Sequence, residues 1–194
     1  MSETNDGNLE FLFDKNYWMW GPCFELIFSF KNKCPLPVFE EALLADSIVS
    51  RFSRSIFPSD TSIRYVLRSE HWKTPIGFIS YQRDRGDRDD HFFSTYPHQV
   101  ERQCGQFMWR DLEDLQPENI QSVVQLYVGL IAFVRRLHTR LGFCQAFIHH
   151  EDNPLFGDGI LEFPGVLIYD SIAEAIHIKS ERVVKGYYAL IPFE

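Results

Sequence analysis

The order of the periodic segments along the chain constrains its fold more than any other feature of the sequence. Short stretches with the two-residue period of β-strands come in groups, and two longer stretches with the helical period stand between those groups. The strict alternation of strand and helix that a doubly wound nucleotide-binding sheet requires is absent. The pattern therefore predicts an α+β fold: a mainly antiparallel sheet with two long helices and one or two short helices packed on one side.

The clearest single element is a helix over residues 118–141. Its apolar side chains recur at helical spacing, Pro117 suits the start of a helix, and Gly142 suits the position after its last turn. A second long helix is expected over residues 38–56, where another apolar stripe ends before Pro58.

The strand pattern is strongest at residues 24–30, where four apolar side chains, three of them phenylalanines, alternate with other residues. Further strands are expected at residues 9–13, 63–68, 76–82, 92–96, 143–148, 165–169 and 187–191, with short helices within 100–115 and from Ser171. Residues 63–68 and 76–82 should form a hairpin. The mixed charges of Arg83–Asp90 predict a solvated, self-neutralising loop, whose arginines would repel a calcium ion.

The length and composition indicate one domain over residues 1–194, with residues 1–7 as a flexible leader. A chain of 194 residues that is 45% hydrophobic can bury a core without needing a disulfide or a metal to fold. The four cysteines are scattered, and the N-terminus is polar and acidic, unlike a signal peptide. No apolar run approaches the roughly 20 residues of a membrane helix. We therefore expect a cytoplasmic protein with reduced thiols.

The charge is acidic, with 27 Asp and Glu against 19 Lys and Arg and a formal net charge of −8. Binding to a nucleic-acid backbone depends on Lys and Arg, so direct nucleic-acid binding is disfavoured. The charge suits either a merely soluble protein or one whose partner is basic, and the sequence leaves both interpretations open.

Motifs of catalysis and cofactor binding are missing from the sequence. It contains no Gly-x-Ser-x-Gly, no Gly-x-Gly-x-x-Gly and no phosphate-binding loop, so we expect no cofactor and no enzymatic activity. An alternative is a metal or acid–base site formed by His149, His150, Glu151 and Asp152. Against it, neighbouring residues on a strand point to opposite faces, which favours a polar strand end. His138, on the apolar stripe of the long helix, is expected to be a partly buried, hydrogen-bonded histidine.

Two groups of residues suit protein recognition. The first is Tyr17–Trp20, in which Trp18 and Trp20 belong either to the core or to an interface, because aromatic residues dominate both. The second is an acidic group around an aromatic side chain, formed by Glu101, Trp109, Asp111, Glu113 and Asp114. Such a group could bind Lys and Arg of a basic partner, or it could be an ordinary solvated surface.

In its overall pattern the chain resembles the immunity proteins of bacterial polymorphic-toxin and type VI secretion systems. The resemblance lies in an acidic cytosolic α+β domain that is rich in Trp, Phe and Asp and lacks catalytic signatures, and it carries no individual residue role. It implies tight binding of a cognate secreted toxin, often a basic nuclease, whose active site is blocked. Two alternatives remain: a phage-encoded inhibitor of a host defence nuclease, and a small metal-dependent hydrolase that uses residues 149–152.

Overall fold

The computed structural model describes residues 24–51, 63–95, 97–104, 120–150, 164–178, 182–184 and 188–193. Within these ranges the strands are β1 (Phe24–Ser29), β2 (Val49–Arg51), β3 (Ile63–Leu67), β4 (Ile76–Asp84), β5 (Asp89–Thr95), β6 (Gln145–His150), β7 (Gly165–Tyr169), β8 (Arg182–Val184) and β9 (Tyr188–Ile191). The helices are α1 (Leu36–Leu44), α2 (Pro97–Cys104), α3 (Ile120–Leu141) and α4 (Asp170–Ala175).

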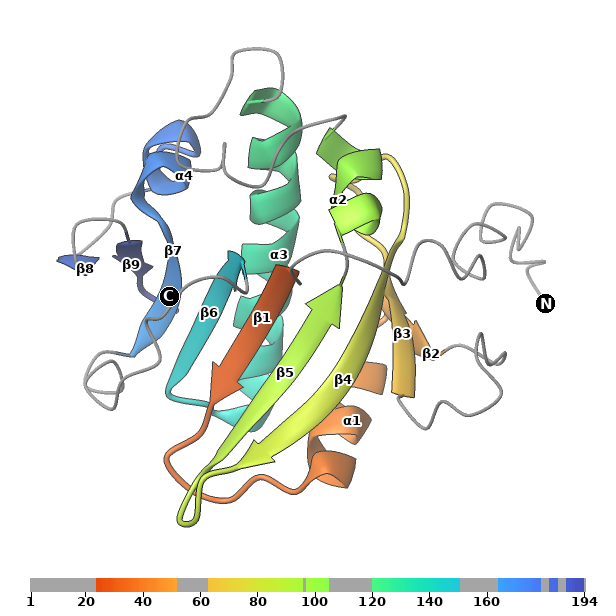
Figure 1. Cartoon of the computed structure of the whole chain (residues 1–194), viewed down its shortest axis with the longest axis vertical. Helices are drawn as coiled ribbons and strands as arrows, with labels where there is room; N and C mark the ends of the chain where they lie inside the picture. Colours follow the sequence, from red (N-terminus) through yellow and green to blue (C-terminus); the bar gives the residue numbers. More distant parts are fainter. Residues whose placement is uncertain are drawn as a thin grey trace.

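All the described strands belong to one sheet, in the order β2-β3-β4-β5-β1-β6-β7-β9-β8 (Figure 1). Only the pair β6 and β7 is parallel, and every other neighbouring pair is antiparallel. The two described edge strands, β2 and β8, have three residues each. The predicted α+β fold with a mainly antiparallel sheet is confirmed, and so is the hairpin of β3 and β4.

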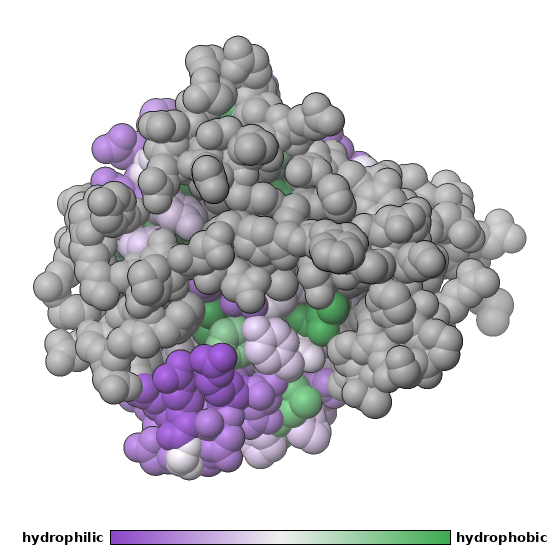
Figure 2. All heavy atoms as spheres, viewed as in Figure 1, coloured by the Kyte–Doolittle hydropathy of each residue, from purple (hydrophilic) through white to green (hydrophobic). Residues whose placement is uncertain are grey.

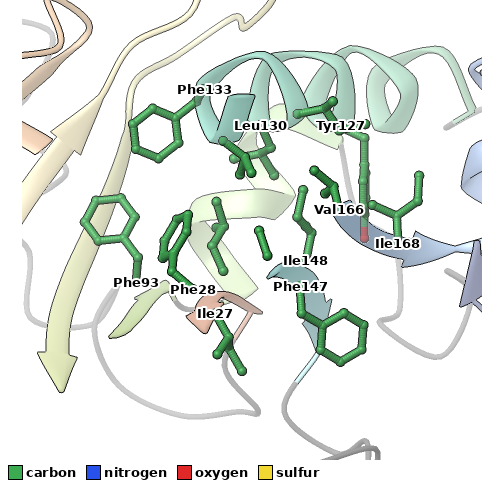
Figure 3. Close-up of a cluster of buried hydrophobic side chains, with 14 of the residues drawn as sticks. Ile27, Phe28, Phe93, Tyr127, Leu130, Phe133, Phe147, Ile148, Val166 and Ile168 are labelled. Carbon is green, nitrogen blue, oxygen red and sulfur yellow. The ribbon is translucent and has the colours of Figure 1, made fainter. Parts of the chain in front are cut away.

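The core lies between the sheet and the helices that cover one of its faces. Figure 3 shows Tyr127, Leu130 and Phe133 of α3 pointing toward the sheet, while Ile27 and Phe147 point away from the helix. Phe93 of β5 meets Phe133 with ring centroids 6.1 Å apart. Burying one such side chain stabilises a fold by about 1.5–3 kcal/mol, so the side chains buried between sheet and helices contribute strongly to the stability of the fold.

Helix α3 is the central element of the helical layer and matches the prediction for residues 118–141 closely. Its buried residues are Val123, Leu126, Tyr127, Gly129, Leu130, Ile131, Phe133, Val134 and Leu137. Gly142 follows the helix with a φ of 62°, and its N–H donates to the His138 carbonyl at 2.8 Å. By length and composition alone α3 could cross a membrane, which the sequence pattern had not indicated; half of its most apolar stretch is buried in the fold. A core helix has the same properties.

The helix predicted over residues 38–56 is shorter than expected. Helix α1 ends at Leu44, and β2 begins at Val49 and pairs with β3. Asp46, which is buried, fixes the turn between them: its carboxylate accepts hydrogen bonds from the Ile48 N–H at 3.2 Å and from Arg136 of α3 at 2.9 Å. The chain therefore turns where the apolar spacing alone would have continued the helix.

The solvated loop predicted over Arg83–Asp90 is shorter than expected. Strands β4 and β5 run up to the paired residues Asp84 and Asp89, and only residues 85–88 form the turn. Asp89 is 1% exposed and accepts hydrogen bonds from the Cys34 N–H at 2.8 Å and from Lys33 at 3.2 Å. Figure 2 shows hydrophilic side chains gathered at the end of the sheet that carries this hairpin in Figure 1. The charged residues therefore belong to the β4–β5 hairpin, and two of them, Asp89 and Asp90, are buried.

The remaining predicted elements lie close to their predicted positions where the structure describes them. The strand predicted at 165–169 has the same bounds as β7, and the short helix predicted from Ser171 begins one residue earlier, as α4. The helix predicted within 100–115 corresponds to α2, which begins at Pro97. The predicted strand at 9–13 lies outside the described residues.

Candidate functional site

The face of the sheet away from the helices carries a row of polar side chains. Glu25 of β1 lies opposite Ser94 of β5 on one side and opposite His149 of β6 on the other. Further along the sheet, Tyr169 of β7 lies opposite Tyr188 of β9. We name these residues, together with Tyr81 of β4, the polar row: Tyr81, Ser94, Glu25, His149, Tyr169 and Tyr188.

The two-residue period of the strands explains why these side chains share a face. In β1, Phe24 and Phe28 pack against aromatic rings of the helical layer, so Glu25 points to the other side. In β6, Ile148 points toward α3 in Figure 3, and its neighbour His149 therefore lies on the polar-row face. The pleat of the strands and the register of the sheet thus place a carboxylate and an imidazole side by side on central strands.

The Glu25 carboxylate is the centre of the hydrogen bonding in the polar row. Its Oε1 accepts hydrogen bonds from the hydroxyls of Tyr81 and Ser94, each at 2.7 Å. Its Oε2 lies 3.8 Å from His149 Nε2. Glu25 is 5% exposed and His149 is completely buried. A buried carboxylate is costly unless it is hydrogen-bonded, and the two hydroxyls meet that requirement here.

Aromatic rings flank this polar group on both sides. The His149 ring stacks on Phe147 with centroids 4.4 Å apart, and Tyr188 meets Phe147 edge-on at 5.0 Å. On the other side, Tyr81 stacks on Phe92 at 4.6 Å. Tyr81 is 41% exposed, so the row reaches the surface at this corner.

Most residues that the sequence analysis selected for partner binding lie outside the described residues. This holds for Trp18, Trp20, Trp109, Asp111, Glu113 and Asp114. Glu101 belongs to α2, but its side chain is not described. The partner-binding set therefore remains a prediction.

The described residues that flank these segments nevertheless meet at one end of the sheet. Phe24, which follows residues 1–23, pairs with Thr95 and with His150, which precedes residues 151–163. Helix α3 follows residues 105–119. Its last residue lies close in sequence to the start of β6, at the opposite end of the sheet, so its first residue lies at the same end as Phe24 and His150 (Figure 1). Glu25, Ser94 and His149 each lie one residue from these boundary positions. We name this the boundary end of the sheet.

The alternative metal site at residues 149–152 gains no support from the described part of the chain. His149 is a buried residue of β6, and the side chain of His150 is not described. Glu151 and Asp152 lie outside the described residues. Among the residues that are described, no group of three or more His, Cys, Asp and Glu side chains could hold a metal ion.

The described cysteines are poor candidates for nucleophiles. Cys34, Cys104 and Cys144 are free thiols, and all three are buried. Burial raises the pKa of Cys34 to about 11 and that of Cys104 to about 12. Because the thiolate is the reactive form, these two thiols are expected to be inert near neutral pH.

Of the polar row, only His149 was predicted from the sequence as a candidate site residue. The one signal for Glu25 is an acidic residue inside a strand of otherwise apolar character, which points to a paired or functional carboxylate. Ser94, Tyr81, Tyr169 and Tyr188 carry no comparable signal, because only the register of the sheet brings them together.

Comparisons of the chain with protein-family models, with curated proteins and with solved structures found no match.

Proposed function

We propose that this chain is an inhibitory binding protein of the immunity type, which binds a basic secreted toxin, such as a nuclease, and blocks its activity. The observation that carries the proposal is the boundary end of the sheet. Three segments outside the described ranges, residues 1–23, 105–119 and 151–163, adjoin described residues that meet there, and the first two contain most of the residues predicted to bind a partner.

The distribution of charge along the sequence supports a basic partner. The three segments contain 12 of the 27 acidic residues and only 2 of the 19 basic ones. The described residues contain 12 acidic and 14 basic residues, so the negative charge of the chain comes from outside the described ranges. Acidic charge that is concentrated in a few segments of a chain can attract a basic partner to those segments.

The aromatic content of the same segments supports a tight complex. Three of the four tryptophans, Trp18, Trp20 and Trp109, belong to them. Tryptophan is enriched among the residues that dominate binding free energies at protein interfaces. The proposal includes no direct contact with nucleic acid, because acidic segments repel phosphates, and it requires neither a membrane nor a cofactor.

A charge-reversal experiment with a matched control tests this proposal. The probe is the basic protein encoded beside the gene for this chain; growth protection on co-expression and affinity by calorimetry are the readouts. Asp111→Lys with Asp114→Lys should weaken binding about 100-fold or more, because like charges in an interface cost several kcal/mol. The matched control is Asp87→Lys with Glu41→Lys. It changes the net charge by the same amount, at exposed positions on the hairpin turn and on α1.

The control pair should bind like the wild type. Equal losses from both pairs would show that only net charge matters, and would contradict the assignment of the interface. Full protection by the Asp111 and Asp114 variant would contradict it as well. A phage-encoded inhibitor of a host nuclease would use similar charge, and the identity of the neighbouring gene distinguishes it from an immunity protein.

A further inference from the structure

The contact between Glu25 and His149 joins the two strands in the middle of the sheet at its boundary end. The two residues are directly opposed in the β1–β6 pair, and His149 Nε2 lies 3.8 Å from Glu25 Oε2. Imidazole is the side chain whose charge ordinarily changes between about pH 5 and 8. The charge on this buried contact should therefore depend on pH near neutrality.

The hydroxyl groups around Glu25 keep its carboxylate negatively charged. Tyr81 and Ser94 both donate to Oε1, and hydrogen bonds to the charged form of an acid favour that form. The other oxygen, Oε2, faces His149. A fixed negative charge at this distance favours the protonated imidazole, while burial favours the neutral one. His149 is thus the member of the pair that changes its charge.

Few other charged groups face the pair from the described strands. The titratable side chains of the neighbouring strands on this face are Tyr81 on β4, Tyr169 on β7 and Tyr188 on β9. Tyrosine is uncharged near neutral pH. Arg83 and Asp90 lie at the far end of β4 and β5, where Asp90 pairs with Arg85 at 2.7 Å. Among these described groups, Glu25 is the nearest charge to His149.

We propose that Glu25 and His149 form a pH-responsive tie between β1 and β6 at the boundary end of the sheet. The attraction between the two side chains exists while His149 is protonated, and it is lost as the pH rises and His149 releases its proton. The strand ends around Phe24 and His150 then become easier to separate. This inference does not depend on the proposed function, and its test requires no binding partner.

Titration of the histidine rings by NMR tests the electrostatic part. His149 and His91 are both completely buried, so the wild type contains its own reference. The midpoint of His149, assigned with His149→Gln, should lie above that of His91. In Glu25→Gln the His149 midpoint should fall by about one pH unit or more, as for the loss of a charge at this range. An unchanged midpoint would overturn the proposal. A wild-type His149 midpoint at or below that of His91 would do the same, even if Glu25→Gln failed to fold.

Hydrogen exchange tests the mechanical part. Between pH 6 and pH 8, protection factors should fall for the amides of residues 24–26 and 148–150, which flank the pair. The amides of Ser29 and Ala146, toward the other end of the same two strands, are the internal control and should keep their protection. In His149→Gln the two ends should no longer differ in their response to pH. Equal losses at both ends in the wild type would overturn the proposal.

Discussion

His91 and His149 lie on opposite faces of the same sheet, and comparing them shows how the surroundings on each face affect the protonation of a buried histidine. Both are 0% exposed, and each stacks on a phenylalanine: His91 on Phe39 at 4.2 Å and His149 on Phe147 at 4.4 Å. The two histidines differ in the polar group that lies near the ring nitrogen Nε2. His91 Nε2 is 2.7 Å from the backbone carbonyl of Cys34, whereas His149 faces a carboxylate.

The two partners have different consequences for protonation. A carbonyl can accept a hydrogen bond from a neutral imidazole, so His91 needs no charge on the helix-covered face. Burial lowers the pKa of His91, against the opposing influence of the Cys34 carbonyl and of Asp89 and Asp90. The helix-covered face therefore holds its histidine as a neutral core residue, while the polar-row face provides a charge that an imidazolium can pair with.

The largest effect should come from breaking the aromatic packing around His91. Phe39 is completely buried and lies 5.4 Å from the Phe28 ring as well as against His91. Phe39→Ala should lower the free energy of unfolding by about 3–5 kcal/mol, because it leaves a cavity in the core. Urea denaturation followed by circular dichroism measures this. A loss below about 1 kcal/mol would show that the helix-covered face is not closely packed.

A smaller effect is expected from adding volume to the same face. The indole of Trp72 lies directly over Gly129 of α3 and donates to the Leu126 carbonyl at 3.3 Å. Alanine forms helices better than glycine, but a methyl group at this position would overlap the indole. Gly129→Ala should therefore destabilise the fold by about 1–3 kcal/mol, as overpacking does. Gly129→Ala combined with Trp72→Phe should recover part of the loss in the same urea assay; a stabilised single variant would refute the close approach.

The smallest effect concerns the pH dependence of stability through His91. Because its pKa in the folded state is lowered, the unfolded chain binds the proton more readily. His91 therefore contributes stability that is present above its unfolded pKa, roughly 6.5, and lost as the pH falls below it. His91→Gln should reduce the drop in unfolding free energy between pH 7.5 and pH 5.5. Urea denaturation at both values checks this, with His177→Gln, at an exposed position, as the control. An identical drop in wild type and His91→Gln would contradict the neutral assignment of His91.

The sequence was sufficient wherever one local period determined the element. The alternation of Phe24, Leu26 and Phe28 is enough to predict a strand, and the apolar stripe of α3 is enough to predict a helix. In both cases the apolar residues recur at the period of the element and so lie on one of its faces. It failed where local patterns compete. Ile48 and Val49 fit the stripe of a helix that began at α1, yet they belong to the turn and the strand that the buried Asp46 arranges.

Long-range register explains the other failures. The burial of Asp89 depends on Lys33 and Cys34, which lie 56 and 55 residues away in the sequence. The hydrogen bonds of Glu25 join it to residues 56 and 69 positions away. A single sequence contains no sign of which strands will be neighbours, so it could name His149 but could not name its partner.

The short edge strands limit how another molecule can attach to this sheet. Unpaired backbone groups at a sheet edge invite strand addition, the mode by which many proteins capture extended peptides and by which others aggregate. Within the described residues, β2 and β8 present only three residues each along the two edges. Such edges provide few backbone hydrogen bonds to an incoming strand. Recognition through the described edges would therefore rest on side chains, and its specificity would be open to change by surface substitutions that leave the sheet intact.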